Sequence, residues 1–398
     1  MRHLDSITIQ CAAVALLAPL ASAQVVTRFV DPLATDPEIV EVELPLADGV
    51  PLEHFVAVNP SNDNGRLFVW LSGSGGAPGQ YQALSTTAAE IGYDVVGLVY
   101  DSWPAVNLFT TNDTDPTLPE RIRRERLFGE DLFDEINVNP ANSVVNRLAK
   151  IIQHQSTNHP AEPWSRYLTP SGEVNWRRVV VGGHSQGAGH TAYLTKAFEL
   201  DGALLIAGPG DFVQGLGTAP WVFEPSLTPA DRCFAFTHVD DPTAPGFFGN
   251  QRILGLDAFG PIESVDGKAA FQIDSHMLAS VLPVPPGDAH SAVAVDALLP
   301  LDANGVPVYR PAWLSMFTRV APGPCTPADI TSTSACEPGL SDGAVDLSDF
   351  SCYLSLWAAS DPAADLTTIG ACQPGTGGDG VTLSDFACYL GIWSVGCP

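Results

Sequence analysis

The sequence predicts an α/β fold, in which a doubly wound, mostly parallel sheet is followed by a small helical module. Three observations support this prediction. Between residues 66 and 317, short apolar runs rich in β-branched residues alternate with stretches of helical periodicity, which is the pattern of a parallel sheet covered by helices. A glycine-rich corner at residues 182–190 joins one such run to a helix. After residue 322 the composition changes, and a repeat with a period of 36 residues begins.

The elements are expected in the following order. Residues 38–44 and 54–58 predict short extended stretches at an antiparallel edge of the sheet. Continuous apolar character predicts strands at residues 66–71, 93–100, 178–181, 203–207 and 233–238. Helices are expected at residues 81–91, 142–154, 191–198 and 292–299. In such sheets the functional residues collect at the carboxyl ends of the strands.

The corner at residues 182–190 carries the motif Gly183-His184-Ser185-Gln186-Gly187. A serine on so tight a turn needs glycines two positions before and after it, because the strand and helix backbones converge there. Gly189 would extend this room for the first helical turn. Ser185 would lie at a helix N-terminus, where N–H groups favour a developing negative charge. We therefore consider Ser185 a candidate nucleophile and the backbone N–H of Gln186 a candidate oxyanion donor; the alternative is a glycine-rich turn without chemistry.

A second glycine-rich segment, Ser72-Gly73-Ser74-Gly75-Gly76, follows the strand expected at residues 66–71. Glycines allow a backbone to approach a substrate carbonyl, so the N–H of Ser74 is the second candidate oxyanion donor. A phosphate-binding loop is the alternative, but no Lys-Ser or Lys-Thr pair follows.

The candidate acid follows the strand expected at residues 233–238. Asp240 and Asp241 both lie there, which is the place of the acid in a triad that runs serine, acid, histidine along the chain. Asp241 is preferred because it leads directly into the turn at Pro242, although an aspartate before proline is also ordinary turn chemistry.

Two histidines lie downstream of this acid. His290 is on a Pro- and Gly-rich loop and His276 is not; a late loop suits a general base that a carboxylate must orient, so His290 is preferred to His276. His184 and His190 flank the candidate nucleophile and are expected to line or support a pocket. His238 is expected to point into the sheet or to support the site.

Together these residues indicate a family. Residues 66–317 resemble the α/β-hydrolase superfamily, through the motif at 183–187 and the loop from Leu71 to Gly76, and the longer form at 182–190 is similar to a bacterial branch, the BPSS1187-like hydrolases. The resemblance implies serine-dependent hydrolysis of a small-molecule or polymeric ester, without a cofactor, in a domain at residues 24–322. The alternative is a non-catalytic extracellular binding protein on the same scaffold.

Composition limits the partners and the compartment. The 398 residues carry a formal net charge of -27, whereas nucleic acids and anionic membranes attract basic patches, so neither is an expected partner. A solvated, salt-bridged helix face is predicted for the one basic cluster, Arg121, Arg123, Arg124 and Arg126.

Residues 1–23 predict a secretory signal, with an apolar run and a small-residue cleavage site at Ala21-Ser22-Ala23. The run is too short to span a bilayer, so we expect a chain that is secreted or held at the cell surface, with no membrane span.

Residues 325–398 lack Lys, Arg and His and repeat themselves, with Leu347–Leu354 matching Leu383–Leu390. Each unit predicts an acidic loop followed by a short amphipathic helix. Oxygen-rich loops suit Ca²⁺. The candidate ligands are Asp329, Asp342, Asp346, Asp349, Asp365, Asp379 and Asp385.

This pattern resembles a dockerin-type duplicated Ca²⁺ module, in the variant at the C-termini of planctomycete exported proteins, with an insertion in each loop around Cys336 and Cys372. The resemblance implies docking to a cell-surface or scaffold partner. For the six cysteines we expect the disulfides Cys336–Cys352, Cys372–Cys388 and Cys325–Cys397, and Cys233 is expected to be a buried free thiol. The alternative is an acidic module held by disulfides alone.

Overall fold

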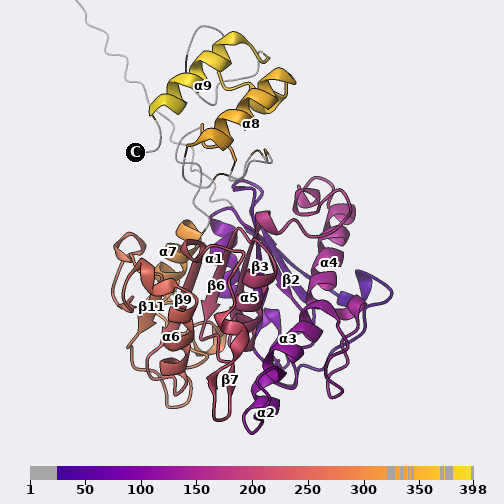
Figure 1. Cartoon of the computed structure of the whole chain (residues 1–398), viewed down its shortest axis with the longest axis vertical. Helices are drawn as coiled ribbons and strands as arrows, with labels where there is room; N and C mark the ends of the chain where they lie inside the picture. The colour runs from indigo at the N-terminus through magenta and orange to yellow at the C-terminus, as the bar shows by residue number, and fades with distance from the viewer. Residues whose placement is uncertain are drawn as a thin grey trace, which may run out of the picture.

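The computed structural model describes residues 25–320, 328–331, 336, 338, 341, 345–367, 372 and 380–395. Within these residues, a nine-stranded sheet with the order β1-β2-β4-β3-β5-β6-β9-β11-β10 forms the centre of the larger part of the chain (Figure 1). Its strands are β1 (Val26–Val30), β2 (His54–Val58), β3 (Leu67–Leu71), β4 (Asp94–Leu98), β5 (Val179–His184), β6 (Gly202–Ile206), β9 (Cys233–His238), β10 (Glu263–Ser264) and β11 (Met277–Ser280). A separate hairpin is formed by β7 (Phe212–Val213) and β8 (Gly217–Thr218).

Strand directions confirm the predicted fold class. β2 pairs antiparallel with both β1 and β4. From β4 to β10 all neighbouring strands are parallel. The parallel strands β3, β5 and β9 are buried along their whole length, which explains their continuous apolar sequences.

Helices cover both faces of the sheet. They are α1 (Gln82–Glu90), α2 (Val106–Thr110), α3 (Leu118–Phe128), α4 (Val144–Asn158), α5 (Gln186–Ala197), α6 (Ala244–Ile253) and α7 (Arg310–Val320). One core cluster joins the sheet to α1 and α7, and a second joins it to α3, α4 and α5. The sheet is therefore doubly wound, as the sequence predicts.

Two predicted elements are wrong. Residues 38–44 form no strand, because their backbone bonds to side chains instead: Val40 donates to Asn142 and accepts from Arg147. Residues 292–299 form turns and a short 3-10 helix at Asp296–Leu298 rather than an α-helix. The Asp296 carboxylate accepts the N–H groups of Gln82 and Ala83 at the start of α1, so this segment is held against the start of α1 and does not form an α-helix.

The C-terminal module contains α8 (Leu347–Ala358) and α9 (Leu383–Val395). Contacts between the two units are reciprocal at the predicted period: Phe350 contacts Trp393, and Trp357 contacts Phe386. On the axis between them the rings of Tyr353 and Tyr389 stack, with centroids 3.8 Å apart and an interplanar angle of 1°. The repeat therefore folds as two similar halves, each of which needs the other to bury its aromatic face.

Two of the three expected disulfides, Cys336–Cys352 and Cys372–Cys388, are confirmed. The third lies outside the described residues, as does the predicted signal at residues 1–23. Cys233 is a buried free thiol, as expected, and burial raises its pKa to about 12. No helix in the described part of the chain is long and apolar enough to cross a membrane.

The module contacts the sheet at the end where the parallel strands begin. Arg66, just before β3, donates to the carbonyl oxygen of Ser341, and Arg178, just before β5, donates to that of Pro338. In Figure 1, α8 and α9 accordingly lie beyond one end of the sheet, and α2 and β7 lie at the other. The carboxyl ends of the parallel strands therefore face away from the module.

Candidate active site

Ser185 lies on the sharp turn between β5 and α5. Its backbone is in the left-handed half of conformational space, with φ 57° and ψ -116°, and such strain in a non-glycine residue is typical of functional positions. A Cβ atom on Gly183 would lie 2.3 Å from the backbone of Gly187, and one on Gly187 would lie 2.0 Å from the carbonyl oxygen of Leu71. The turn therefore requires both glycines. Gly183 is needed because the strand and helix backbones converge, as inferred from the sequence, whereas Gly187 is needed because the end of β3 approaches the helix.

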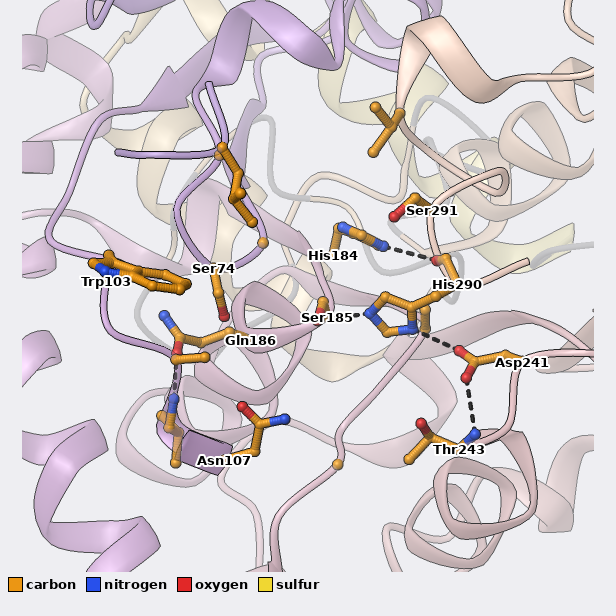
Figure 2. A pocket seen from close by; sticks show the side chains of 18 of the residues that line it. Ser74, Trp103, Asn107, His184, Ser185, Gln186, Asp241, Thr243, His290 and Ser291 are labelled. Atoms are coloured by element: carbon orange, nitrogen blue, oxygen red, sulfur yellow. Dashed lines mark hydrogen bonds and ion pairs between the residues drawn. The ribbon is translucent and has the colours of Figure 1, made fainter. Parts of the chain in front are cut away.

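A continuous chain of hydrogen bonds links an acid, a histidine and this serine (Figure 2). His290 Nε2 lies 2.8 Å from Ser185 Oγ, and His290 Nδ1 lies 2.6 Å from Asp241 Oδ2. The other carboxylate oxygen of Asp241 accepts the backbone N–H of Thr243 at 2.8 Å. Since a carboxylate only accepts, Nδ1 carries the ring proton, and Nε2 is left to accept the serine proton.

Of the two candidate acids, the structure brings Asp241 to the histidine and leaves Asp240 apart. The Asp240 side chain is exposed, whereas Asp241 is 2% exposed. Burial alone would raise the pKa of Asp241, but hydrogen bonds from His290 and Thr243 outweigh it, so the pKa is lowered. The carboxylate beside His290 is therefore ionised at neutral pH.

Of the two candidate bases, His276 lies at the wrong end of the sheet. It precedes β11, opposite the beginning of β9, whereas Ser185 follows the end of β5. Its ring stacks between Phe234 and Phe259, and its Nδ1 donates to the carbonyl oxygen of Cys233. Burial lowers the pKa of His276 to about 4. His276 is a neutral core residue.

The two candidate oxyanion donors meet beside the serine. In Figure 2, Ser74 and Gln186 both lie next to Ser185. In the glycine-rich loop the neighbouring N–H groups are already engaged: Gly73 donates to Tyr81, Gly75 to Ser102, and Gly76 to the carbonyl of Gly73. The N–H groups of Ser74 and Gln186 have no acceptor within the described part of the chain. Both residues line the same cavity as Ser185.

The three remaining histidines of this region contact residues that surround the candidate site. His184 contacts Tyr81 and the backbone of His290. His190 is fully buried beside Arg123, and burial holds its pKa well below the usual value. His238 bonds to the carbonyl of Leu282 and receives the N–H of Asp240, so it supports the loop that carries the acid.

The prediction for the basic cluster is wrong for two of its four arginines. Arg121 and Arg124 form surface ion pairs, but Arg123 and Arg126 are 2% and 1% exposed. Arg123 makes a double ion pair with Asp211 and donates to the carbonyl of Gln186. It also occupies the space beside Gly189, where a Cβ atom would lie 2.0 Å from the guanidinium. Gly189 thus makes room for Arg123 rather than for the first helical turn to approach the strand.

Gln186 has a second role that the sequence does not reveal. Its side-chain oxygen accepts from the N–H of Val106 and from Arg126, and its amide donates to the carbonyl of Ser102. The residue that follows Ser185 therefore fixes the segment that carries Trp103 against the turn.

A cavity of about 680 Å³ opens over Ser185. Much of its wall is apolar or aromatic, from Leu46, Tyr81, Trp103, Val106, Phe247, Val295 and Leu298. Arg123 and Asp211 also line it, but they neutralise each other. The space suits an uncharged organic ligand with one polar group that reaches Ser185.

The predicted calcium ligands are only partly described, because Asp342 and Asp379 lie outside the described residues. Asp349 accepts three backbone N–H groups, and Asp385 accepts the three equivalent ones. Asp346 caps α8. Within the described residues, no group of three or more His, Cys, Asp or Glu side chains could hold a metal ion. Calcium binding, including any part for Asp329 and Asp365, stays a prediction.

No protein-family model matches the sequence, and no curated protein matches it. Among solved structures, a bacterial heroin esterase is similar over 77% of this chain and 86% of its own, with 15% identity and a TM-score of 0.37. A sugar hydrolase from Lactococcus lactis matches 67% of this chain and 93% of its own at 12% identity and a TM-score of 0.34. A thermostable esterase from Pseudomonas putida matches 66% of this chain and 74% of its own, at 12% identity and a TM-score of 0.30. The resemblances to one bacterial branch and to dockerin modules stay predictions.

Proposed function

We propose that the chain is a serine hydrolase that cleaves carboxylic esters through an acyl-enzyme. Ser185 Oγ attacks the ester carbonyl while His290 Nε2 takes its proton, and Asp241 holds the imidazole and stabilises its charged form. His290 then returns the proton to the departing alcohol. In the second half of the reaction water attacks the acyl-enzyme, His290 takes a proton from it and passes this proton to Ser185 Oγ, and the acid is released. The N–H groups of Gln186 and Ser74 stabilise the oxyanion.

The observation that carries this proposal is the unbroken chain from Asp241 through His290 to Ser185, at 2.6 and 2.8 Å. Each contact serves one step, and the geometry is that of a base within reach of the proton it abstracts. The strained turn at Ser185 adds support, because it lifts the hydroxyl above the strand into the cavity.

The test compares the chain with its Ser185→Ala variant on short p-nitrophenyl esters. We expect the variant to lose hydrolysis while its thermal melt stays that of the parent chain. Retained turnover would refute the assignment of the nucleophile. The rival function, a non-catalytic extracellular binding protein, needs no activated serine and would leave both proteins inactive and unlabelled by a fluorophosphonate.

We also propose that the chain is exported and that residues 325–398 form a docking or anchoring module. The contacts of Arg66 and Arg178 with this module lie where the parallel strands begin, whereas the cavity lies at their carboxyl ends. A module attached to a surface would therefore leave the cavity open to the substrate.

A further inference from the structure

His184 takes no part in the proposed chemistry, yet it contacts both loops on which that chemistry depends. Its Nε2 lies 2.9 Å from the carbonyl oxygen of His290, and its Nδ1 lies 3.2 Å from the hydroxyl of Tyr81. That hydroxyl also lies 3.2 Å from the backbone N–H of Gly73. A chain of hydrogen bonds thus joins the oxyanion loop (residues 72–76) to the base loop (residues 283–290).

The direction of each bond in this chain is determined. A carbonyl oxygen only accepts, so Nε2 of His184 must carry the ring proton and donate to His290. Nδ1 is then the acceptor, so Tyr81 donates its hydroxyl proton to it. The phenol oxygen is left to accept the N–H of Gly73. One tautomer of a neutral ring satisfies all three bonds.

The surroundings keep the ring neutral and in place. His184 is 3% exposed. Its pKa is lowered to about 3, mainly by burial and to a smaller extent by the charge of the nearby His290. Tyr81 is 3% exposed and packs against Trp70, with ring centroids 5.2 Å apart. A Cβ atom on Gly73 would lie 2.9 Å from Nδ1 of His184, so the oxyanion loop approaches this ring as closely as its glycine allows.

We propose that His184 and Tyr81 are positioning residues that hold the oxyanion loop and the base loop in register. They act through backbone atoms: Tyr81 holds the N–H of Gly73, the residue before Ser74, and His184 holds the carbonyl of His290 itself. The proton acceptor and one oxyanion donor are then aligned by a single chain of bonds. The inference rests on the proposed function, for which a misplacement of about 1 Å would cost roughly 100-fold in rate.

The bonding can be tested without any substrate. In the full chain with ¹⁵N-labelled histidine, long-range ¹H–¹⁵N spectra should show His184 as the neutral Nε2–H tautomer from pH 5 to pH 8. Tyr81→Phe should shift the Nδ1 resonance of His184. Tyr93→Phe should not, because the equally buried Tyr93 hydroxyl donates to the carbonyl oxygen of Phe317 elsewhere in the core. A charged ring or the Nδ1–H tautomer would overturn the proposal even if the chain proves to be an esterase.

Kinetics on a p-nitrophenyl ester then test the positioning role. Tyr81→Phe should lower kcat by about 10- to 100-fold with KM changed by less than about 3-fold, while Tyr93→Phe keeps the parent kcat. His184→Gln can still donate to His290 and accept from Tyr81, so it should retain more activity than His184→Leu. An unchanged kcat in Tyr81→Phe, or equal losses in the Gln and Leu variants, would overturn the proposal. If the Leu variant does not fold, the comparison of Tyr81→Phe with Tyr93→Phe decides.

Discussion

The sharpest consequence of the site geometry concerns Asp241→Asn. The variant keeps the shape of the side chain but replaces one acceptor oxygen by an NH₂ donor. The backbone N–H of Thr243 donates to Oδ1 of Asp241 at 2.8 Å, so the oxygen of the new amide must stay on that side. The NH₂ group then faces Nδ1 of His290, which must become an acceptor.

This substitution exchanges the tautomer of the His290 imidazole. When Nδ1 accepts, the ring proton moves to Nε2, and Nε2 can no longer take the proton of Ser185. In serine hydrolases that lose the acid in this way, kcat falls by about 10⁴-fold, which corresponds to about 5.5 kcal/mol of transition-state stabilisation. We expect a loss of this size, with the cavity and the oxyanion donors intact.

The assay is the kcat of p-nitrophenyl butyrate hydrolysis near pH 7, with Asp240→Asn as the matched control. The control changes the adjacent, exposed carboxylate and should keep activity within about 2-fold, since surface substitutions rarely perturb a site. A loss of less than about 10-fold in Asp241→Asn, or equal losses in both variants, would refute the reasoning from the Thr243 contact.

Three further predictions follow from other parts of the chain. Burial raises the pKa of Asp94 to about 6; its folded form therefore binds a proton between about pH 4 and 6 that the unfolded chain releases, and its contribution to stability falls as the pH rises through that window. In urea unfolding, the free energy of unfolding of Asp94→Asn should rise relative to that of the parent chain, on the order of 2 kcal/mol, between pH 4 and pH 7. A difference independent of pH would contradict this. Since Arg123 is neutralised by Asp211 in a chain of net charge -27, p-nitrophenyl butyrate should have a kcat/KM at least about 10-fold above that of the similar-sized p-nitrophenyl hemisuccinate, whose carboxylate the field repels; equal values would argue against this selection. If the module binds Ca²⁺, EGTA should speed amide exchange in α8 and α9 of the full chain, because an ion held only by the folded state stabilises it, whereas identical exchange would favour a module held by disulfides alone.

Local patterns of the sequence were sufficient for the central turn and for the strands beside it. β9 covers the predicted residues 233–238 without change, because an apolar run bounded by turn residues identifies a buried strand. Gly183 reflects a backbone contact with Gly187, close by in the chain, although Gly187 itself lies against the carbonyl of Leu71 at the end of β3. The period of 36 residues was sufficient to predict two similar units in the C-terminal module, but not the reciprocal aromatic contacts by which they pack together.

Other features depend on tertiary contacts that no local pattern reports. The partner of Arg123 is Asp211, 88 residues away, so the sequence favoured a solvated helix face; Gly189 was the available signal, because a glycine inside a helix leaves room for a neighbour. The choice between Asp240 and Asp241 depends on which side chain turns inward after β9. Residues 292–299 have apolar helical spacing, but the bond of Asp296 with the start of α1 prevails.

The central claim is that Ser185 is an activated nucleophile, and covalent trapping tests it most directly. The full chain is treated with a fluorophosphonate and digested, and the modified residue is located by mass spectrometry. The proposed mechanism predicts one phosphonyl group per molecule, on Ser185, at a rate that falls steeply in Asp241→Asn. A chain that remains unmodified, or that is modified on another serine, would contradict it.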